Sequence, residues 1–488
     1  MKTTTITTLG ALKEIGYQSK SIKDELRDNL LKKMMNKENV FHGVHGYGDT
    51  VIPELERAIL SRHNINLLGL RGQAKTRLAR LMLNLLDEYV PVVKGSEIND
   101  DPLHPISRYA IELIKKDKDG TAIEWLHRND RFSEKLATPD VTVADIIGDV
   151  DPIKAANLKL SYADDRVIHY GMIPRANRCI FVINELPDLQ ARIQVALFNI
   201  LQEGDIQIRG FKLRLPLDIQ FVFTANPEDY TNRGSIVTPL KDRIGSQIFT
   251  HYPKSIELAR KITQQEAKVS SADKALIQVP SLAKDLLEEV AFQARSSEYV
   301  DAKSGVSARL TISAMENLMA AAKLRLIETS SDKTRIRLVD FISIIPSITG
   351  KIELVYEGEQ EGADEVAKIL IDNAVIKQFE KIFPRIPKLE KEGVKTPYTD
   401  LIHWFDNNFI ELNYTDTDTE FYTNLKTIIP LSSVIEKYAS KLSKEDQYFC
   451  MELVLWGLTI NNKLDKSEND TAYKFDSAGI GQYFHRSN

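Results

Sequence analysis

The chain has 488 residues, of which 43% are hydrophobic and 27% are charged, and its formal net charge is −5. This length exceeds one ordinary hydrophobic core, so we expect two or three domains. The slight negative charge gives no electrostatic basis for non-specific nucleic-acid binding, and no run approaches the roughly 20 apolar residues that cross a bilayer. The two cysteines, Cys179 and Cys450, indicate no disulfide framework. Because the N-terminus also lacks the apolar stretch of a signal peptide, we expect a cytoplasmic protein.

The first part of the chain changes character near residue 40. Residues 1–40 are polar and weakly helical, which predicts an N-terminal helical extension. Strand and helix signals begin in the following segment, residues 41–253, with a strand at Ile65–Leu68. The helix after this strand carries apolar residues at helical spacing on one face, namely Leu78, Leu81, Leu85 and Tyr89.

The middle of this segment predicts a sheet. Residues 91–140 read as irregular apart from a helix within 105–116. Between residues 179 and 226 the pattern is strand, helix, strand, with the three elements at 180–183, 189–201 and 218–225. This alternation predicts a parallel sheet whose two faces are covered by helices.

Strand signals become sparse after residue 253, where we place a domain boundary. An α-helical domain is predicted at residues 254–345, with helices within 254–269, 280–296 and 307–328. The rest, residues 346–488, is predicted to be mostly helical, with a long helix within 364–383. Its last stretch, from residue 461, is polar and is expected to be exposed.

The first chemical motif follows the strand at 65–68 and reads GLRGQAKT, residues 69–76. A loop between a strand and a helix N-terminus presents backbone N–H groups to phosphates, so Lys75 would reach the β- and γ-phosphates and Thr76 would ligate Mg²⁺. The usual pattern has a second glycine where this chain has Ala74, which requires Ala74 to be helical with φ below zero. The alternative is a strand–turn–helix with a chance Lys-Thr. The expected cofactor-binding residues of this loop are Gly69, Arg71, Gly72, Gln73, Ala74, Lys75, Thr76 and Arg77.

A second motif ends the strand at 180–183 with Asn184 and Glu185. Ligands of open α/β sheets bind at the carboxyl ends of strands, where Glu185 would polarise the water that attacks the γ-phosphate. Asn184 occupies the Mg²⁺ side. Its amide oxygen can accept a hydrogen bond from a metal-bound water, but it carries no charge and should hold Mg²⁺ less firmly than aspartate.

Three further polar residues complete the candidate catalytic set. Asn226 follows the next strand and would lie beside the attacking water; otherwise it begins a turn before a proline. Arg243 could reach the nucleotide of a neighbouring subunit as an arginine finger, or be a surface arginine. Arg309, near a helix start in the second domain, could contact the γ-phosphate, or be an exposed helix-start arginine.

The order of these motifs resembles an AAA+ ATPase over roughly residues 40–345, and within that group the clade of the magnesium chelatase ATPase subunit and the MoxR-type ATPases. The narrower match is carried by GVHGYGDTVIPELERAIL at 43–60, by GMIPRANR at 171–178, and by the hairpin LQEGDIQIRGFKLRLPLDIQF at 201–221 with Arg-Gly as its turn. The resemblance implies an α/β fold: an AAA+ P-loop parallel sheet with helices on both faces, then an α-helical lid and the mostly helical C-terminal segment. It also implies that Val44 and Tyr47 belong to the nucleotide pocket.

The resemblance further implies the cofactors ATP and Mg²⁺ and a homo-oligomeric ring, usually a hexamer. In such a ring Asn226 acts as sensor one, Arg243 as finger and Arg309 as sensor two. The implied activity is ATP hydrolysis that remodels or matures a partner protein, and for MoxR-type relatives that partner carries a von Willebrand factor A domain. Alternatives are a nucleotide-dependent assembly scaffold with little hydrolysis, which Asn184 favours, a magnesium chelatase subunit proper, and an AAA+ transcription activator.

Overall fold

The computed structural model describes residues 5–160, 165–203, 206–208, 211–213, 215–227, 235–387, 395–468 and 472–478. The chain divides into two compact units, Met1–His251 and Tyr252–Asn488.

The first unit is built on a five-stranded parallel sheet in the order β11-β1-β10-β7-β4. Its strands are β1 (Ile65–Leu68), β4 (Phe132–Leu136), β7 (Cys179–Asn184), β10 (Ile219–Ala225) and β11 (Ser246–Phe249). From β1 the chain crosses to the far edge at β4 and returns strand by strand to β10, and it then passes to β11 on the other side of β1. The connections therefore diverge between β1 and β10, and ligands of open α/β sheets bind at such a switch point, beyond the carboxyl ends of the strands.

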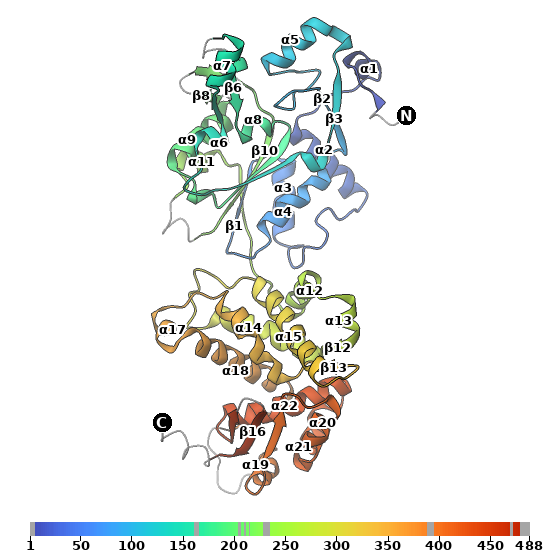
Figure 1. Ribbon diagram of the computed structural model, residues 1–488, viewed down its shortest axis with the longest axis vertical. Helices are drawn as coiled ribbons and strands as arrows, with labels where there is room; N and C mark the ends of the chain where they lie inside the picture. The colour runs from blue at the N-terminus through green and yellow to red at the C-terminus, as the bar shows by residue number, and fades with distance from the viewer. Residues whose placement is uncertain are drawn as a thin grey trace. The chain divides into compact units, whose positions relative to one another are not determined.

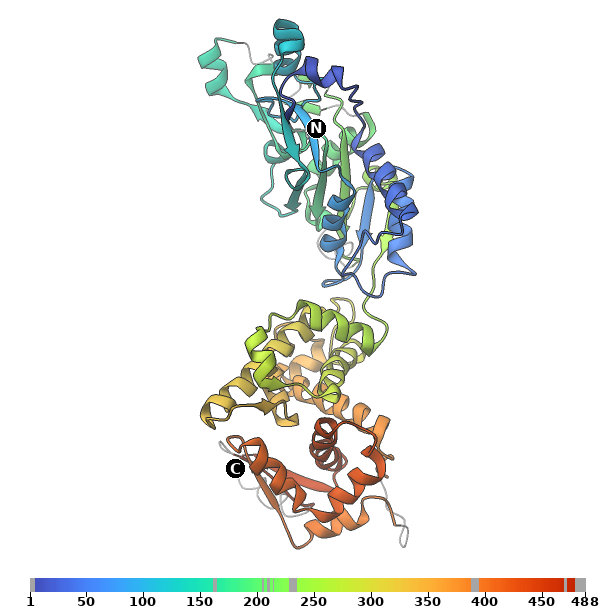
Figure 2. The ribbon, with the colours of Figure 1, turned by 90° about the vertical axis from the view of Figure 1, so that its right-hand side faces the viewer.

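Helices cover both faces of this sheet because successive strand side chains point to opposite faces. Ile180 and Val182 of β7 share a core with α2 (Ile22–Met35), α3 (Val51–Leu60) and α4 (Lys75–Leu81). Phe181 and Ile183 share the opposite core with α8 (Met172–Arg175), α9 (Ala191–Glu203) and α11 (Thr238–Arg243). The blue helices lie on one side of the strands and the green helices on the other (Figures 1 and 2). The expected fold class, an α/β P-loop sheet followed by a helical part, is confirmed.

The helix after the first strand is shorter than its apolar spacing predicts. It ends at Leu81 and continues as a 3₁₀ turn, Met82–Leu85. Leu78 and Leu85 are buried as expected, but Tyr89 is exposed and begins the next strand. The backbone N–H of Asp87 donates to the buried carboxylate of Glu25 at 2.7 Å, a tertiary contact in the segment where the helix was expected to continue.

The prediction that residues 91–140 are irregular is wrong apart from its helix. The helix is α5 (Arg108–Asp117). Antiparallel strands β2 (Tyr89–Val93) and β3 (Ile123–His127) flank it in sequence, and β4 then joins the edge of the main sheet. The strand β4 escaped prediction because it reads FSEKL, and an edge strand that is only partly buried lacks an apolar signature.

Smaller elements of the first unit are α1 (Leu9–Glu14), α6 (Val143–Ile146), α7 (Pro152–Leu158), and the antiparallel pairs β5 (Gly148–Val150) with β6 (Ile168–Tyr170) and β8 (Ile206–Ile208) with β9 (Phe211–Leu213). The pair β8–β9 is the hairpin expected after α9. Its predicted Arg-Gly turn, at residues 209–210, lies outside the described residues.

Helices dominate the second unit, and those predicted within 254–269, 280–296, 307–328 and 364–383 are confirmed. Its helices are α12 (Ile256–Glu266), α13 (Ser271–Leu276), α14 (Ser281–Ser296), α15 (Arg309–Glu328), α16 (Ile345–Thr349), α17 (Tyr356–Glu361), α18 (Ala363–Ile382), α19 (Thr399–Phe405), α20 (Asp418–Lys426), α21 (Ile429–Ala439) and α22 (Lys444–Ile460). The short strands β12 (Ile277–Gln278) and β13 (Thr334–Arg335) pair in parallel. One apolar core runs from Ile277 to Phe475. None of the helices in the described ranges combines the length and hydropathy that a membrane-spanning segment requires.

The expectation of an exposed polar stretch from residue 461 is wrong where the structure describes it. Strands β14 (Ile410–Asn413), β15 (Leu464–Glu468) and β16 (Ala472–Ser477) form an antiparallel sheet in the order β14-β16-β15. Leu464, Tyr473 and Phe475 are buried in the core of the second unit. The two aromatic residues stand two positions apart in β16, so their side chains share one face of the strand. The many polar neighbours hide this two-residue alternation in the sequence.

Both cysteines are free and buried. Burial raises the pKa of the Cys179 thiol to about 12, so this side chain behaves as a small apolar group at the start of β7.

Candidate functional site

The loop between β1 and α4 has the geometry of an anion cradle. Gly72 has φ of +74° and Ala74 has φ of +57°, so two left-handed residues alternate with their neighbours immediately before the helix. Successive N–H groups in such an arrangement converge on a concavity that binds anions. The expectation that Ala74 is helical with φ below zero is wrong. The turn needs a left-handed residue there, and Ala74 adopts this conformation despite its Cβ.

The floor of the loop is closely packed. The Gly69 N–H donates to the Ala225 carbonyl at 3.1 Å, which joins the ends of β1 and β10. A Cβ on Gly69 would collide with Thr250 Oγ1 and Gln73 Oε1, two atoms that are themselves hydrogen-bonded at 2.7 Å. Only glycine fits at position 69 without displacing this bond.

Tyr47 reaches the loop from the segment before α3. Its hydroxyl lies 2.9 Å from the Gln73 carbonyl and 2.8 Å from the His251 carbonyl, and its ring meets that of His251 edge-on at 5.0 Å. Val44 packs against the core under α2 to α4. Arg71 and Arg77 are half-buried, one in the loop and one in the first turn of α4.

Lys75 is the first residue of α4 and is buried. Its ammonium group donates to the carbonyl of Gly69 and, at 3.1 Å, to that of Leu70. The Lys75 ammonium group is thereby held across the loop. A phosphate bound there can accept hydrogen bonds from it in place of the two carbonyls.

A hydrogen-bonded group joins Thr76 to the ends of β7 and β10. Asn184 Oδ1 accepts from Thr224 Oγ1 at 3.0 Å and lies 3.4 Å from Thr76 Oγ1. The Glu185 N–H donates to Thr224 Oγ1 at 3.2 Å, and Glu185 is left-handed with φ of +54°. Thr224 therefore fixes both polar residues of the second motif. Sequence reasoning missed it, although a threonine in an otherwise apolar strand end was a usable signal.

The other side of the Asn184 amide faces β4. Asn184 Nδ2 donates to Glu134 Oε1 at 2.6 Å, and Arg80 of α4 pairs with Glu134 Oε2 at 2.8 Å. The Arg80 guanidinium also lies over the ring of Phe132, 5.2 Å from its centre. Sequence reasoning missed Glu134 because it missed the strand that carries it.

Asn226 directly follows β10, at the carboxyl ends of the strands where Asn184 and Glu185 also lie. Its Oδ1 atom is buried and has no hydrogen-bond partner among the described residues. A buried acceptor of this kind is costly unless water or a ligand satisfies it. The orphaned oxygen therefore fits a site that receives a hydrated ligand.

The two candidate arginines belong to different units, Arg243 to the first and Arg309 to the second. Arg243 ends α11, where it pairs with Asp242, donates from Nε to Gln202 at 3.3 Å and lies over the Phe198 ring at 5.6 Å. It is 40% exposed. Arg309 begins α15 of the second unit, where its N–H donates to Ser307 Oγ at 3.1 Å. The contacts that the structure describes for Arg243 do not include the loop at 69–76.

The residues at the carboxyl ends of β1, β7 and β10 fit a Mg²⁺–nucleotide. The described ranges hold no group of three or more histidine, cysteine, aspartate or glutamate side chains suited to a metal ion. Mg²⁺ does not need one, because it keeps several waters and binds substrate phosphates with few protein ligands. The Thr76 hydroxyl and the Asn184 amide oxygen lie close enough to share such an ion and its water, beside an anion cradle that contains Lys75.

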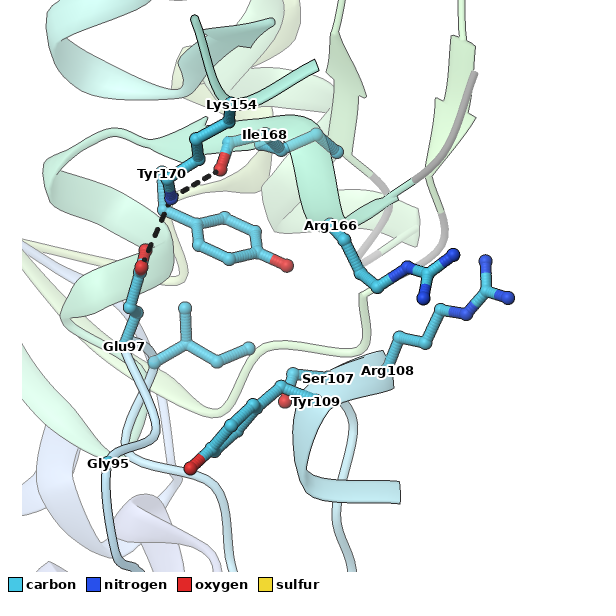
Figure 3. Close-up of a pocket in the computed structure, with 10 residues that line it drawn as sticks. Gly95, Glu97, Ser107, Arg108, Tyr109, Lys154, Arg166, Ile168 and Tyr170 are labelled. Atoms are coloured by element: carbon cyan, nitrogen blue, oxygen red, sulfur yellow. Dashed lines mark hydrogen bonds and ion pairs between the residues drawn. The ribbon is translucent and has the colours of Figure 1, made fainter. Parts of the chain in front are cut away.

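A cavity of about 310 Å³ lies between α5, α7 and β6 (Figure 3). The side chains of Tyr109 and Tyr170 are drawn around it, and the Arg108 and Arg166 side chains extend toward one edge. Lys154 pairs with Glu97 across its wall at 3.2 Å. The cavity shares no lining residue with the loop at 69–76.

No family model matches the sequence. Among solved structures, a chain of the magnesium chelatase complex between subunits BchI and BchD aligns with a TM-score of 0.36 and 17% identity, over 66% of this chain and 98% of that chain. NtrX from Brucella abortus aligns at 0.35 and 14%, over 59% of this chain and 54% of its own length, and it has also been solved with ATP and with ADP. A RuvB variant from Thermotoga maritima aligns at 0.33 and 11%, over 95% of this chain and 98% of its own. The chain spans about half the length of NtrX. The fold assignment rests on this chain's own strand order, covered sheet and phosphate-type loop.

Proposed function

We propose that this chain is an ATP-binding and ATP-hydrolysing motor of the AAA+ type that remodels or matures a partner protein. The observation that carries the proposal is the hydrogen-bonded group of Thr76, Asn184, Thr224 and Glu185 beside the buried amine of Lys75. The group lies at the switch point of a parallel sheet, where nucleotide chemistry is expected.

Each residue has a distinct task in this proposal. Lys75 and the loop N–H groups hold the phosphates, and Thr76 with Asn184 holds Mg²⁺. Bound Mg²⁺ supplies positive charge to the phosphate oxygens. Glu185 polarises the attacking water, and Asn226 orients it with the buried oxygen that lacks a protein partner among the described residues.

The arginines enter through assembly and movement. Arg243 is exposed at the end of α11, and we assign it to the nucleotide of a neighbouring copy in a homo-oligomeric ring, by resemblance a hexamer. Arg309 is assigned to the γ-phosphate when the helical lid closes. The partner implied by resemblance to MoxR-type ATPases carries a von Willebrand factor A domain, and the chain itself is proposed to act in the cytoplasm without nucleic acid.

Binding and turnover of a fluorescent ATP analogue by the full chain test this proposal. Wild type should bind it with Mg²⁺ and hydrolyse ATP. Lys75→Ala should lose binding, whereas Glu185→Gln should bind and lose turnover by about 100-fold or more. Glu124→Gln, an exposed glutamate in β3, is the matched control and should change neither quantity. Absence of nucleotide binding in wild type contradicts the proposal.

Asn184 favours a second candidate, an assembly scaffold in which ATP drives ring formation with little hydrolysis. A neutral amide at the metal side should slow turnover more than binding. Size-exclusion chromatography with and without Mg-ATP separates the two candidates. Nucleotide-dependent assembly without measurable turnover in wild type would establish the scaffold and exclude the motor.

A further inference from the structure

Asn184 stands between a carboxylate, which only accepts hydrogen bonds, and two hydroxyl groups, which both donate and accept. Its Nδ2 atom faces the Glu134 carboxylate at 2.6 Å, and its Oδ1 atom faces the hydroxyls of Thr224 and Thr76 at 3.0 and 3.4 Å. The Glu134 side chain is 28% exposed, so water screens this contact only in part.

The carboxylate fixes the orientation of the amide. An ionised carboxylate only accepts hydrogen bonds, so a flipped Asn184 would set its carbonyl oxygen against Glu134 Oε1 and its amine toward Thr76. The hydroxyls of Thr76 and Thr224 can either donate or accept and therefore impose no orientation of their own. Among the described contacts of Asn184, the one with Glu134 alone requires its oxygen to face Thr76.

Glu134 also supplies a negative charge near the carboxyl ends of the strands. It projects from β4, where it is paired in register with Val182, two residues before Asn184. Arg80 holds its outer oxygen, Oε2, and leaves the inner oxygen, Oε1, directed at the amide. Asn184 carries no charge itself, but its amide is hydrogen-bonded to a charged carboxylate on the neighbouring strand.

We propose that Glu134 is a positioning residue for the Mg²⁺ site: it orients the Asn184 oxygen toward Thr76, so that the Glu134–Asn184 pair does jointly what one aspartate would do alone. This inference rests on the proposed nucleotide site. It adds a residue outside the phosphate loop and the second motif, and it makes Asn184 one half of a pair.

The pair also changes what a substitution of Asn184 should do. Asn184→Asp by itself brings a second carboxylate against Glu134, and like charges at this separation oppose one another. It therefore impairs the site and does not repair it. The double variant Glu134→Gln, Asn184→Asp exchanges the two groups. The amide then stands on β4 and the carboxylate on β7, so the pair still consists of one amide and one carboxylate.

The test measures binding of a fluorescent ATP analogue by the full chain as Mg²⁺ is titrated, alongside binding in EDTA. Glu134→Gln should raise the half-saturating Mg²⁺ concentration about tenfold, the usual scale for loss of a residue that orients a metal ligand. Binding in EDTA should stay unchanged. Asn184→Asp should also raise the Mg²⁺ midpoint, and the double variant should return it to within about threefold of wild type.

Controls separate the possible failures. Glu124→Gln in β3 should match wild type, and thermal unfolding of each variant shows whether it is folded. If wild type binds no nucleotide, the proposed function fails. If wild type binds Mg-nucleotide but Glu134→Gln leaves the Mg²⁺ midpoint unchanged, or if the double variant is no better than the worse single variant, the positioning role is overturned and the proposed function stands.

Discussion

Glu25 and Arg131 form a bidentate ion pair inside the first unit, with N–O distances of 2.8 and 2.6 Å and side chains that are 4% and 1% exposed. Glu25 belongs to α2 and Arg131 directly precedes β4, so the pair ties α2 to the edge strand of the sheet. The Arg131 Nε–H also donates to the Arg178 carbonyl at 2.9 Å. The helix α2 is thereby an integral part of the first unit.

Removal of one partner of this pair should destabilise the first unit strongly. Glu25→Leu or Arg131→Met leaves an uncompensated buried charge, which costs about 3–5 kcal/mol of unfolding free energy. The double variant should lose much less than the sum of the two, because no charge is left buried. Urea unfolding of the full chain, followed in the transition of the first unit, measures these losses. Lys13→Ala at the exposed Lys13–Asp119 pair is the control and should not differ from wild type. Additive losses in the double variant would contradict this account.

Ala74→Gly should stabilise the phosphate-type loop. A left-handed conformation costs a residue with a Cβ roughly 1–2 kcal/mol, whereas glycine loses about 0.5–1 kcal/mol of entropy on ordering, so the net gain is on the order of 0.5 kcal/mol. The control Ala79→Gly lies buried inside α4 and should cost about 1 kcal/mol or more. Thermal unfolding should therefore shift in opposite directions for the two variants. A loss of the same size in both would mean that position 74 behaves as helix interior.

The sequence predicted those parts of the fold whose signals are local. The strands β1, β7 and β10 are short, mostly apolar runs, and the helices α12, α14, α15 and α18 of the second unit repeat apolar residues at helical spacing. Each pattern therefore indicated one type of element. The edge strand β4 lacked such a signal. Its side chains can be polar, because β4 pairs with one neighbouring strand, β7, and stays partly open to solvent.

The candidate site shows the same division. The two motifs predicted four site residues, and all four lie at the carboxyl ends of the strands: Lys75, Thr76, Asn184 and Glu185. Glu134 was missed together with its strand, and Thr224 was missed although its place at a strand end was a usable signal. The contact of each residue with Asn184 depends on the register between distant strands, which tertiary packing sets. The conformation of Ala74 was missed because the replacement of glycine by alanine argued locally for φ below zero.

Gly69→Ala should damage the loop although the change is a single methyl group. Its Cβ would strike the hydrogen-bonded Thr250 and Gln73 side chains, and forced overpacking typically costs about 1–3 kcal/mol. We expect a lower unfolding temperature and weaker binding of a fluorescent ATP analogue. Gly48→Ala is the matched control, since nothing lies within 4 Å of its Cβ position, and it should leave both quantities unchanged. Equal behaviour of the two variants would show that the loop relaxes freely around residue 69.

Glu452 is a carboxyl group in the core of the second unit. Its Oε2 atom accepts from the Leu338 N–H at 3.0 Å and from the Tyr473 hydroxyl at 3.4 Å, while Oε1 has no partner among the described residues. Burial raises the pKa of Glu452 from 4.5 to about 8, against the opposing charge of Arg337 and with a smaller contribution from Asp340. At neutral pH the folded protein therefore holds this side chain largely protonated.

The stability of the second unit should consequently fall as pH rises from about 4.5 to 8. In this window the folded state binds the Glu452 proton and the unfolded state does not, so the stabilisation is complete below pH 4.5 and is lost as pH passes through the folded pKa of about 8. The loss should be on the order of a few kcal/mol. Glu452→Gln keeps a neutral side chain at every pH and should reduce the slope of unfolding free energy against pH, measured by urea titrations of the full chain between pH 5 and 8.5. A residual slope of the same sign is expected from Glu288, whose pKa burial raises to about 7. Glu365→Gln, on the exposed face of α18, should keep the wild-type slope. If Glu452→Gln keeps it as well, the proton taken up on folding is bound elsewhere.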